Sequence, residues 1–312
     1  MHARCLAGAL AVGFLLSASS CATTEVPASD ASQVPSSPKP TSTAAAPESV
    51  LHAILATTVL GVGSQRVAFI LTRPDSLVPV PEATVTSVYL DGQNGASETK
   101  QAAFYLWPYG VRGSYSTKFF LNQPGQWRLD VSVTSDDGTN RQTQVFLDVQ
   151  ERVEVAGVGS VPPLIRNKTV WDVESLAELS SAAAPDPDLY AMTITTAMTT
   201  GNPTMIVFST PAFCVSPTCG PQVEVLTDLQ DTYGDQANFI HVELYDNPAD
   251  IQGDLSAARY SPLVDAWGLS SVPGWTNESW TFVLGRDGRI ASRFEAFAPR
   301  EELEQTLLAL LN

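Results

Sequence analysis

The feature that most limits how this chain can fold is a pair of cysteines five residues apart, placed between a strand-like and a helix-like segment. Residues 204–210 (TMIVFST) form a continuous apolar run, and residues 221–235 carry apolar side chains at helical spacing. On a regular helix, residues five apart have Cα atoms ~8.7 Å apart, beyond the ~7 Å that a disulfide can span. Cys214 and Cys219 therefore cannot both lie on one regular helix and form a bridge.

Two prolines indicate how the chain can avoid this conflict. Pro217 and Pro221 lack a backbone N–H, which a helix tolerates only before its start or in its first turn. The sequence therefore predicts a helix that begins between Cys219 and Pro221, with Cys214 in a loop that folds back. Ser216 is suitably placed to cap a turn in that loop.

The N-terminal segment has the pattern of an export signal. In residues 1–21 one basic residue precedes an apolar run, and small residues follow it, as in a secretory signal peptide. The end of this segment, ASSC, resembles the bacterial lipobox that precedes a lipidated cysteine, although Ala18 replaces the usual aliphatic residue. Residues 22–49 are rich in Ser, Thr, Pro and Ala, which predicts a disordered tether. We therefore expect an extracytoplasmic protein, lipid-anchored to the bacterial cell membrane through Cys21, with ordinary cleavage after Ala22 as the alternative.

Charge and cysteine content exclude several classes of function. The net charge of −16 argues against nucleic acid as a partner, because phosphate binding needs a basic patch. Of the four cysteines, Cys5 would leave with the signal peptide and Cys21 would carry the lipid, so one close pair remains in an oxidising compartment. With three histidines in the chain, we expect no metal site, and nothing in the sequence predicts a cofactor.

Residues 50–155 have the pattern of an antiparallel β-structure. Segments such as RVAFIL, ATVTSVYL and QWRLDVSV alternate apolar and polar residues, and turn-forming sequences such as DGQNG and SDDGTN separate them. Six or seven such strands predict an immunoglobulin-like sandwich. Its many aromatic residues are interpreted as core and edge side chains, with a ligand-binding face as the alternative.

The second half of the chain alternates strands and helices. Residues 156–189 contain Pro162-Pro163 and Pro185-Asp186-Pro187 and are interpreted as a connector with one short helix in its middle part. From residue 190 to the C-terminus the periodicity predicts strands at 204–210 and 238–246, a helix at 221–235, a strand pair within 279–297 and an amphipathic helix at 299–312.

This order, with the cysteine pair in AFCVSPTCGPQ, resembles the thioredoxin superfamily, and more closely its membrane-anchored extracytoplasmic members of the TlpA/ResA type in bacteria. The resemblance covers residues 190–312. FIHVELYDNP is similar to the second strand of that family, DAWGLSSVP to the segment before its cis-proline, and WTFVLGRDGRI to its closing hairpin. The resemblance implies an α/β thioredoxin-like domain, which together with the β-sandwich expected for residues 50–155 gives a two-domain protein.

The chain departs from the family pattern at several positions. The cysteine spacing is CXXXXC instead of CXXC, Phe213 replaces a frequent Trp, and Phe208 stands where thioredoxin has a buried acid. The cis-proline is ambiguous: Pro273 keeps that role if the following residues are an insertion, which we favour, and otherwise Ser279 occupies the place.

A cysteine between a strand and a helix lies near unpaired backbone N–H groups, which together with the helix dipole stabilise a thiolate. We therefore expect Cys214 to be the nucleophile and Cys219 the resolving cysteine of a thiol–disulfide oxidoreductase. Its substrates would be thiols and disulfides of exported proteins, and an unidentified membrane redox partner would reset it. The expected site also includes a substrate groove at Phe213, Pro273, Trp275 and Trp280, and a loop with Ser216, Pro217, Gly220 and Pro221.

Two other functions compete with this hypothesis. The CXXXXC pair also resembles peroxiredoxin Q, a thiol peroxidase, although Thr210 lies one position too far from Cys214 and Glu278 and Ser279 stand where an Arg would polarise the peroxide. A redox-inactive scaffold or binding lipoprotein is the third possibility. Copper delivery is disfavoured, because His241 is not followed by another histidine near the closing hairpin.

Overall fold

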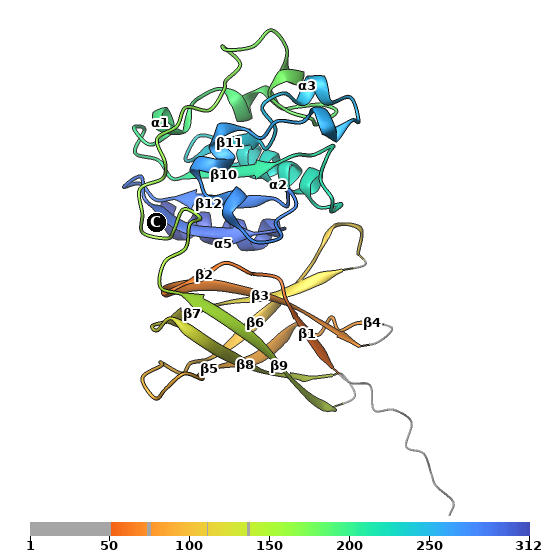
Figure 1. Cartoon of the computed structure of the whole chain (residues 1–312), viewed down its shortest axis with the longest axis vertical. Coiled ribbons are helices and arrows are strands. Elements are labelled where there is room, and N and C mark those ends of the chain that lie inside the picture. The colour runs from red at the N-terminus through yellow and green to blue at the C-terminus, as the bar shows by residue number, and fades with distance from the viewer. Residues whose placement is uncertain (1–50, 74–75, 111, 136–137) are drawn as a thin grey trace, which may run out of the picture. The chain divides into compact units, whose positions relative to one another are not determined.

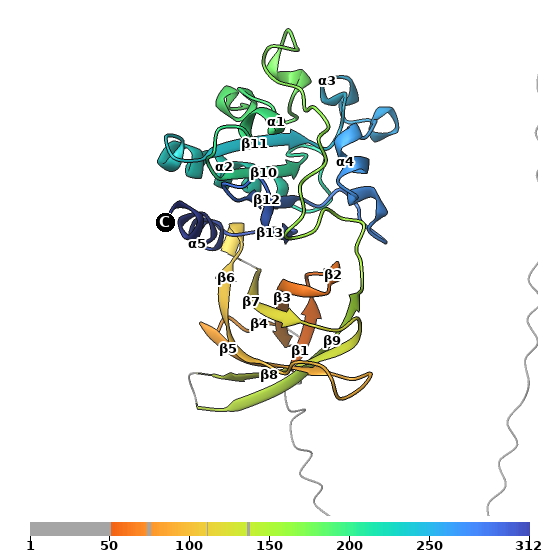
Figure 2. The same ribbon diagram turned by 90° about the vertical axis from the view of Figure 1, so that its left-hand side faces the viewer.

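The first half of the folded chain is a single curled sheet of nine strands. The computed structural model describes residues 51–73, 76–110, 112–135 and 138–312, which belong to one compact unit. Its strand order is β1-β3-β7-β6-β5-β8-β9-β2, with β4 paired to β3 (Figures 1 and 2). The strands are β1 (His52–Leu55), β2 (Leu60–Gly61), β3 (Gly63–Arg73), β4 (Ser76–Leu77), β5 (Glu82–Tyr89), β6 (Thr99–Leu106), β7 (Gly113–Leu121), β8 (Gly125–Thr134) and β9 (Asn140–Gln150).

Alternation along the strands builds the core of this sheet. In β8, Trp127, Leu129, Val131 and Val133 are all buried, while the residues between them are more exposed. The same period gives one apolar face to each long strand, and curling of the sheet brings these faces together into one cluster. The strands expected from the sequence are present, but an immunoglobulin-like sandwich is not confirmed, because hydrogen bonds join the strands in one continuous path instead of two separate sheets.

The second half of the chain is built on a four-stranded sheet. Its order is β11-β10-β12-β13, with β10 and β11 parallel and the other two pairings antiparallel. These strands are β10 (Thr204–Ser209), β11 (Asn238–Glu243), β12 (Trp280–Leu284) and β13 (Ile290–Glu295). All side chains of β10 and β12 are buried, as expected for strands covered on both faces.

Helices cover this sheet on its two faces. Met205 and Val207 of β10 pack in a cluster with side chains of α2 (Cys219–Tyr233) and α5 (Arg300–Leu311). Ile206 and Phe208 pack in the opposite cluster, with α1 (Ile194–Ala197), α4 (Pro262–Ala266) and Trp267. Figure 2 shows the sheet edge-on between these helices. The remaining helical segments are α3 (Pro248–Ile251) and the 3-10 turns η1 (Pro108–Gly110), η2 (Leu176–Glu178), η3 (Pro187–Tyr190), η4 (Leu255–Ala257) and η5 (Leu269–Ser271).

Several predictions concern segments at the edges of this fold. The expected short helix of the connector is the single turn η2, which begins with a capping box between Ser175 and Glu178. The expected signal peptide, the expected lipidation of Cys21 and the expected tether over residues 22–49 concern positions outside the described residues. Within the described part of the chain, no helix has the length and apolar character needed to cross a membrane.

Candidate functional site

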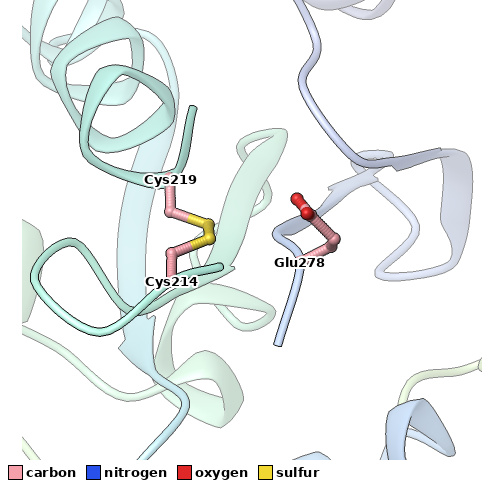
Figure 3. Close-up of side chains that lie close together, drawn as sticks. All are labelled: Cys214, Cys219 and Glu278. Carbon is pink, nitrogen blue, oxygen red and sulfur yellow. A yellow bond between two sulfur atoms is a disulfide. The ribbon is translucent and has the colours of Figure 1, made fainter. Parts of the chain in front are cut away.

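The two cysteines within the described residues form a disulfide at the start of α2. Cys214 and Cys219 are bonded, and their Cα atoms are 6.1 Å apart, within the range that a disulfide spans. Helix α2 begins at Cys219, as the proline spacing predicts, so Cys214 lies in the preceding loop (Figure 3). Cys219 is fully buried and Cys214 is half-buried. Of the two sulfurs, that of Cys214 is therefore the one that a partner molecule can approach first.

The four predicted loop residues surround this disulfide in different ways. Pro217 is exposed, and Pro221 is the third residue of α2, where its missing N–H costs no hydrogen bond. Gly220 is the second residue of the helix, and a Cβ at this position would lie 3.9 Å from the Pro211 carbonyl oxygen, an ordinary contact distance. Ser216 accepts a hydrogen bond from the Thr218 N–H at 3.4 Å, which agrees with the expected cap of a turn.

Asn277 holds the loop that carries Cys214. Its side-chain oxygen accepts a hydrogen bond from the Val215 N–H at 3.0 Å, and its side-chain nitrogen donates to the Phe213 carbonyl at 2.9 Å. The same nitrogen donates to the Tyr245 hydroxyl at 3.0 Å. The main-chain carbonyl oxygen of Asn277 lies 3.6 Å from the Cys214 sulfur and 3.8 Å from the Cys219 sulfur. Asn277 thus contacts both sulfurs and both chain neighbours of the outer cysteine.

This arrangement decides which residue lies next to the pair. The structure brings Asn277 to the sulfurs, whereas Pro273, the favoured cis-proline, is exposed in the turn that follows η5. Ser279, the alternative, is fully buried directly before β12. Asn277 adopts a left-handed conformation with φ 64°, which asparagine tolerates better than most residues. No periodicity runs through residues 273–279, so no local pattern indicates a functional role for Asn277.

A carboxylate faces the disulfide from the same segment. The Sγ atoms of Cys214 and Cys219 and a carboxylate oxygen of Glu278 lie within 4.8 Å of one another (Figure 3). The Ser216 hydroxyl donates a hydrogen bond of 2.8 Å to Oε2 of Glu278. Burial raises the pKa of the Glu278 carboxyl, and the hydrogen bond from Ser216 opposes part of this rise. The site therefore combines the positive end of helix α2, which favours a thiolate, with an acid that opposes it when ionised.

The predicted substrate groove is present only in part. Trp280 is 1% exposed in the core beneath the sheet, because it begins the continuous buried run of β12, so it cannot line a surface groove. Phe213 and Trp275 are half-buried, and they belong to a row of aromatic rings that runs through Tyr245 and Tyr260. Successive ring centroids in the row are 6.2, 5.3 and 5.7 Å apart. Tyr245 lies at the end of the predicted strand 238–246 and Tyr260 lies outside every predicted element, and no local pattern indicates that their rings meet.

A buried acid lies on β11, next to the strand that carries Phe208. Phe208 packs against Trp267 and Phe282, as its apolar side chain requires, while Glu243 of β11 is buried behind the loop that follows β10. Burial raises the pKa of the Glu243 carboxyl, which accepts hydrogen bonds of 2.8 Å from the Ser181 N–H and hydroxyl. The Ser181 hydroxyl also accepts a hydrogen bond from the Ala212 N–H. Through Ser181, Glu243 therefore helps to hold the segment that precedes Cys214.

His241 is occupied by structural hydrogen bonds. Its Nδ1 lies 2.6 Å from the Tyr190 hydroxyl and its Nε2 lies 3.2 Å from the Ser209 carbonyl. Burial lowers the pKa of His241 to about 4, so the ring is neutral, donating to the carbonyl and accepting from the tyrosine. Because both ring nitrogens are engaged, neither is free to bind a metal.

Comparison with known proteins gives weak structural likeness. No family model matches the sequence, and no curated protein matches it. A thiol:disulfide interchange protein of the thioredoxin family from Chlorobium tepidum TLS is similar over 50% of this chain and 99% of its own, with 13% identity and a TM-score of 0.34. CopC from Methylosinus trichosporium OB3b covers 32% of this chain and 94% of its own, at 12% identity and a TM-score of 0.21. Murine CRIg covers 33% of this chain and 99% of its own, at 13% identity and a TM-score of 0.20.

Proposed function

We propose that this protein is a thiol–disulfide oxidoreductase whose Cys214–Cys219 pair alternates between disulfide and dithiol. The observation that carries the proposal is the disulfide at the start of α2, with one buried and one half-buried sulfur. A six-residue ring stabilises a fold little, because the entropy removed from the unfolded chain grows with loop length. A short bridge at a helix N-terminus suits reversible exchange better than structural support.

The unequal burial of the two cysteines supports different roles for them in the proposed cycle. In the reducing direction, the Cys214 thiolate attacks a substrate disulfide, which forms a mixed disulfide and releases one substrate thiolate. The Cys219 thiolate then attacks the Cys214 sulfur, releases the second substrate thiolate and restores the protein disulfide. Two electrons pass from the protein to the substrate in this cycle, and the opposite direction runs through the same mixed disulfide.

For residues 190–312 we propose a thioredoxin-like domain. The support is the central sheet with β10 and β11 parallel and two antiparallel strands beside them, covered by helices on both faces. The aromatic row from Phe213 to Trp275 begins beside Cys214 and offers an apolar surface to a substrate chain. The preceding curled sheet, over residues 50–155, is proposed as a separate domain joined by the connector at 156–189.

We further propose that the mature protein acts outside the cytoplasm, held by a lipid on Cys21, on cysteines of exported proteins. The support is the signal-like sequence of residues 1–21 and the polar tether that follows it. Incorporation of a labelled fatty acid in a bacterial host tests the anchor. Labelling of the wild-type chain and its loss in Cys21→Ser are expected, and equal labelling of the two would contradict lipidation of this cysteine.

Reduction of insulin disulfides by dithiothreitol tests the enzymatic proposal. The assay uses the full chain with Cys5→Ser and Cys21→Ser, called the two-cysteine protein below, so that only the pair contributes. We expect it to accelerate the reduction, Cys214→Ser to abolish the acceleration, and Cys219→Ser to accumulate a mixed disulfide with the substrate. A protein that neither accelerates the reaction nor forms the mixed disulfide would contradict the proposal and favour a redox-inactive scaffold.

The peroxidase hypothesis receives no comparable support. A peroxidatic cysteine needs a cation or hydrogen-bond donors for the oxygen that leaves as an anion. Among the described residues, Glu278 is the charged side chain that faces the two sulfurs, and its charge has the wrong sign for that role.

A further inference from the structure

The Glu278 carboxylate lies beside the disulfide, and no positive side chain is paired with it among the described residues. Among the described residues, no lysine, arginine or histidine forms an ion pair with Glu278. Its hydrogen bond is to the neutral hydroxyl of Ser216. When the disulfide is reduced, two acidic thiols and one carboxyl therefore share a partly buried place, where like charges repel strongly. A bound cation would allow all three groups to ionise together.

The chemistry of the ligand atoms selects the kind of cation. Two thiolates are soft donors and a carboxylate is a hard one, a mixture that suits zinc, which binds both types. The main-chain carbonyl oxygen of Asn277 lies 3.6 and 3.8 Å from the two sulfurs. Its partial negative charge also favours a cation beside them. We propose that the reduced form of this protein binds one zinc ion through Cys214, Cys219 and Glu278, and that oxidation to the disulfide abolishes the site.

The distances allow this geometry after small movements. Zinc–sulfur bonds of about 2.3 Å and zinc–oxygen bonds of about 2.1 Å place the ligand atoms of a tetrahedral ion roughly 3.6–3.8 Å apart. The three groups already lie within 4.8 Å of one another, and the Cα atoms of the two cysteines are 6.1 Å apart. Rotation of the two cysteine side chains after reduction is therefore enough to direct both sulfurs at one ion.

The neighbours of these groups complete the site. The Ser216 hydroxyl binds Oε2 of Glu278 and fixes the carboxylate, the role that hydrogen-bonded neighbours of metal ligands commonly have. Among the described residues, the hydrogen bond that the Glu278 carboxylate accepts is made by Oε2. Oε1 is therefore available to bind the ion. Three protein ligands leave a fourth position for water or a substrate thiolate. Zinc binding would hold the dithiol as a stored, non-exchanging form, because coordinated thiolates attack disulfides poorly.

Zinc titration of the reduced two-cysteine protein against a chromophoric zinc chelator tests the inference. The inference depends on the proposed function only in requiring a reducible disulfide, and chemical reduction under nitrogen followed by removal of the reductant supplies the dithiol directly. We expect one zinc ion per reduced chain and none per oxidised chain. Glu278→Gln is expected to lower the affinity at least about tenfold, because it removes a charged ligand. The matched control Glu224→Gln, at an exposed position of α2, should remain within about twofold of the parent.

Cobalt(II) provides a second measurement that needs no variant. The absorption of a tetrahedral ion with thiolate charge-transfer bands in the reduced protein supports the site, and the weak spectrum of a six-coordinate ion overturns it. Unchanged affinity in folded Glu278→Gln, judged by circular dichroism, also overturns it, as does equal zinc binding by the oxidised chain. Zinc binding without insulin reduction would support the zinc site and contradict the proposed enzyme activity. Insulin reduction without zinc binding would support the enzyme activity and contradict the zinc site.

Discussion

At the scale of single residues, Asn277 holds the loop around Cys214 because its side chain has both a hydrogen-bond acceptor and a donor. It is 4% exposed and bridges the main chain on both sides of Cys214. We predict that Asn277→Ala destabilises the oxidised protein by about 2–4 kcal/mol, since buried main-chain groups lose their partners and alanine resists a positive φ. Urea unfolding measures this change.

A glycine at the same position separates the two causes. Asn277→Gly keeps the left-handed conformation without strain, so we expect it to lose only the hydrogen bonds and to be more stable than Asn277→Ala by about 1 kcal/mol. An alanine variant as stable as the wild type would mean that the side-chain contacts of Asn277 do not hold the loop.

The lowered pKa of His241 makes the stability of the folded protein depend on pH. Burial lowers its pKa to about 4 from an ordinary 6.5, so the unfolded chain binds a proton that the folded chain rejects between these values. Its contribution to stability is therefore fully present above pH 6.5 and is lost as the pH falls toward 4, by about 3 kcal/mol at most. Glu243, which lies near it, acts with the opposite sign, because its raised pKa favours the folded state at low pH.

A variant that cannot titrate isolates this effect. His241→Gln can still donate to the Ser209 carbonyl and accept from the Tyr190 hydroxyl, so the fold should tolerate it. We expect the difference in unfolding free energy between wild type and variant to fall between pH 6.5 and 4, and to be constant above pH 7. A constant difference over the whole range would indicate that His241 keeps its ordinary pKa.

At the scale of elements, the aromatic row is the feature that a substrate chain would contact. Trp275 is half-buried at one end of it, and its indole N–H donates to the Glu278 carbonyl at 2.9 Å. We predict that Trp275→Ala lowers kcat/KM for a protein disulfide about two- to tenfold, because one aromatic contact contributes about 0.5–1.5 kcal/mol. Reduction of a small disulfide, which needs no extended surface, should change little.

Trp171 offers a matched control for this variant. It is 85% exposed in the connector and has no place in the aromatic row, so Trp171→Ala should leave both substrates unaffected. Equal loss with the small and the protein substrate in Trp275→Ala would mean that the tryptophan supports the site instead of contacting the substrate.

The elements that the sequence predicts well are those with a strong period or a steric break. The strand at 204–210 and the helix start at Cys219 follow from an apolar run and from two prolines, both local signals. The continuous path of the first sheet was not predictable, because alternation assigns faces to strands and says nothing about which strands pair. Trp280 was misplaced because a tryptophan beside a loop can be either exposed or the first residue of a buried strand.

The parts of the site that local sequence signals specify could be predicted, and those that depend on tertiary contacts could not. The cysteine pair and its loop could be read from spacing, since the chemistry of cysteine and the geometry of proline leave few alternatives. Asn277 and Glu278 come to the pair through tertiary contacts with residues about 60 positions earlier in the chain, and Glu243 acts on the preceding segment through Ser181; no local pattern connects them to it. Contacts of this kind appear only when the fold is known.

At the scale of the whole molecule, a buried ion pair links the nine-stranded sheet to helix α5. Arg66 of β3 binds Glu302 of α5 through two hydrogen bonds of 2.6 and 2.7 Å, and the Ser116 hydroxyl adds a third at 2.8 Å. The two charged side chains are 4% and 12% exposed. The guanidinium also lies 5.2 Å above the ring of Phe294, so the pair is enclosed by both halves of the described chain.

Removing one partner of this pair should cost far more than removing both. We predict that Glu302→Ala destabilises the protein by about 3–5 kcal/mol, because it leaves the Arg66 charge buried without a partner. The double variant Arg66→Met with Glu302→Leu replaces both charges by apolar side chains of similar volume, so its stability should return toward that of the wild type. Urea unfolding of Arg66→Met, Glu302→Leu and the double variant that combines them gives the coupling free energy. Additive losses would mean that the two side chains are solvated separately and that the halves of the molecule are held together by other contacts.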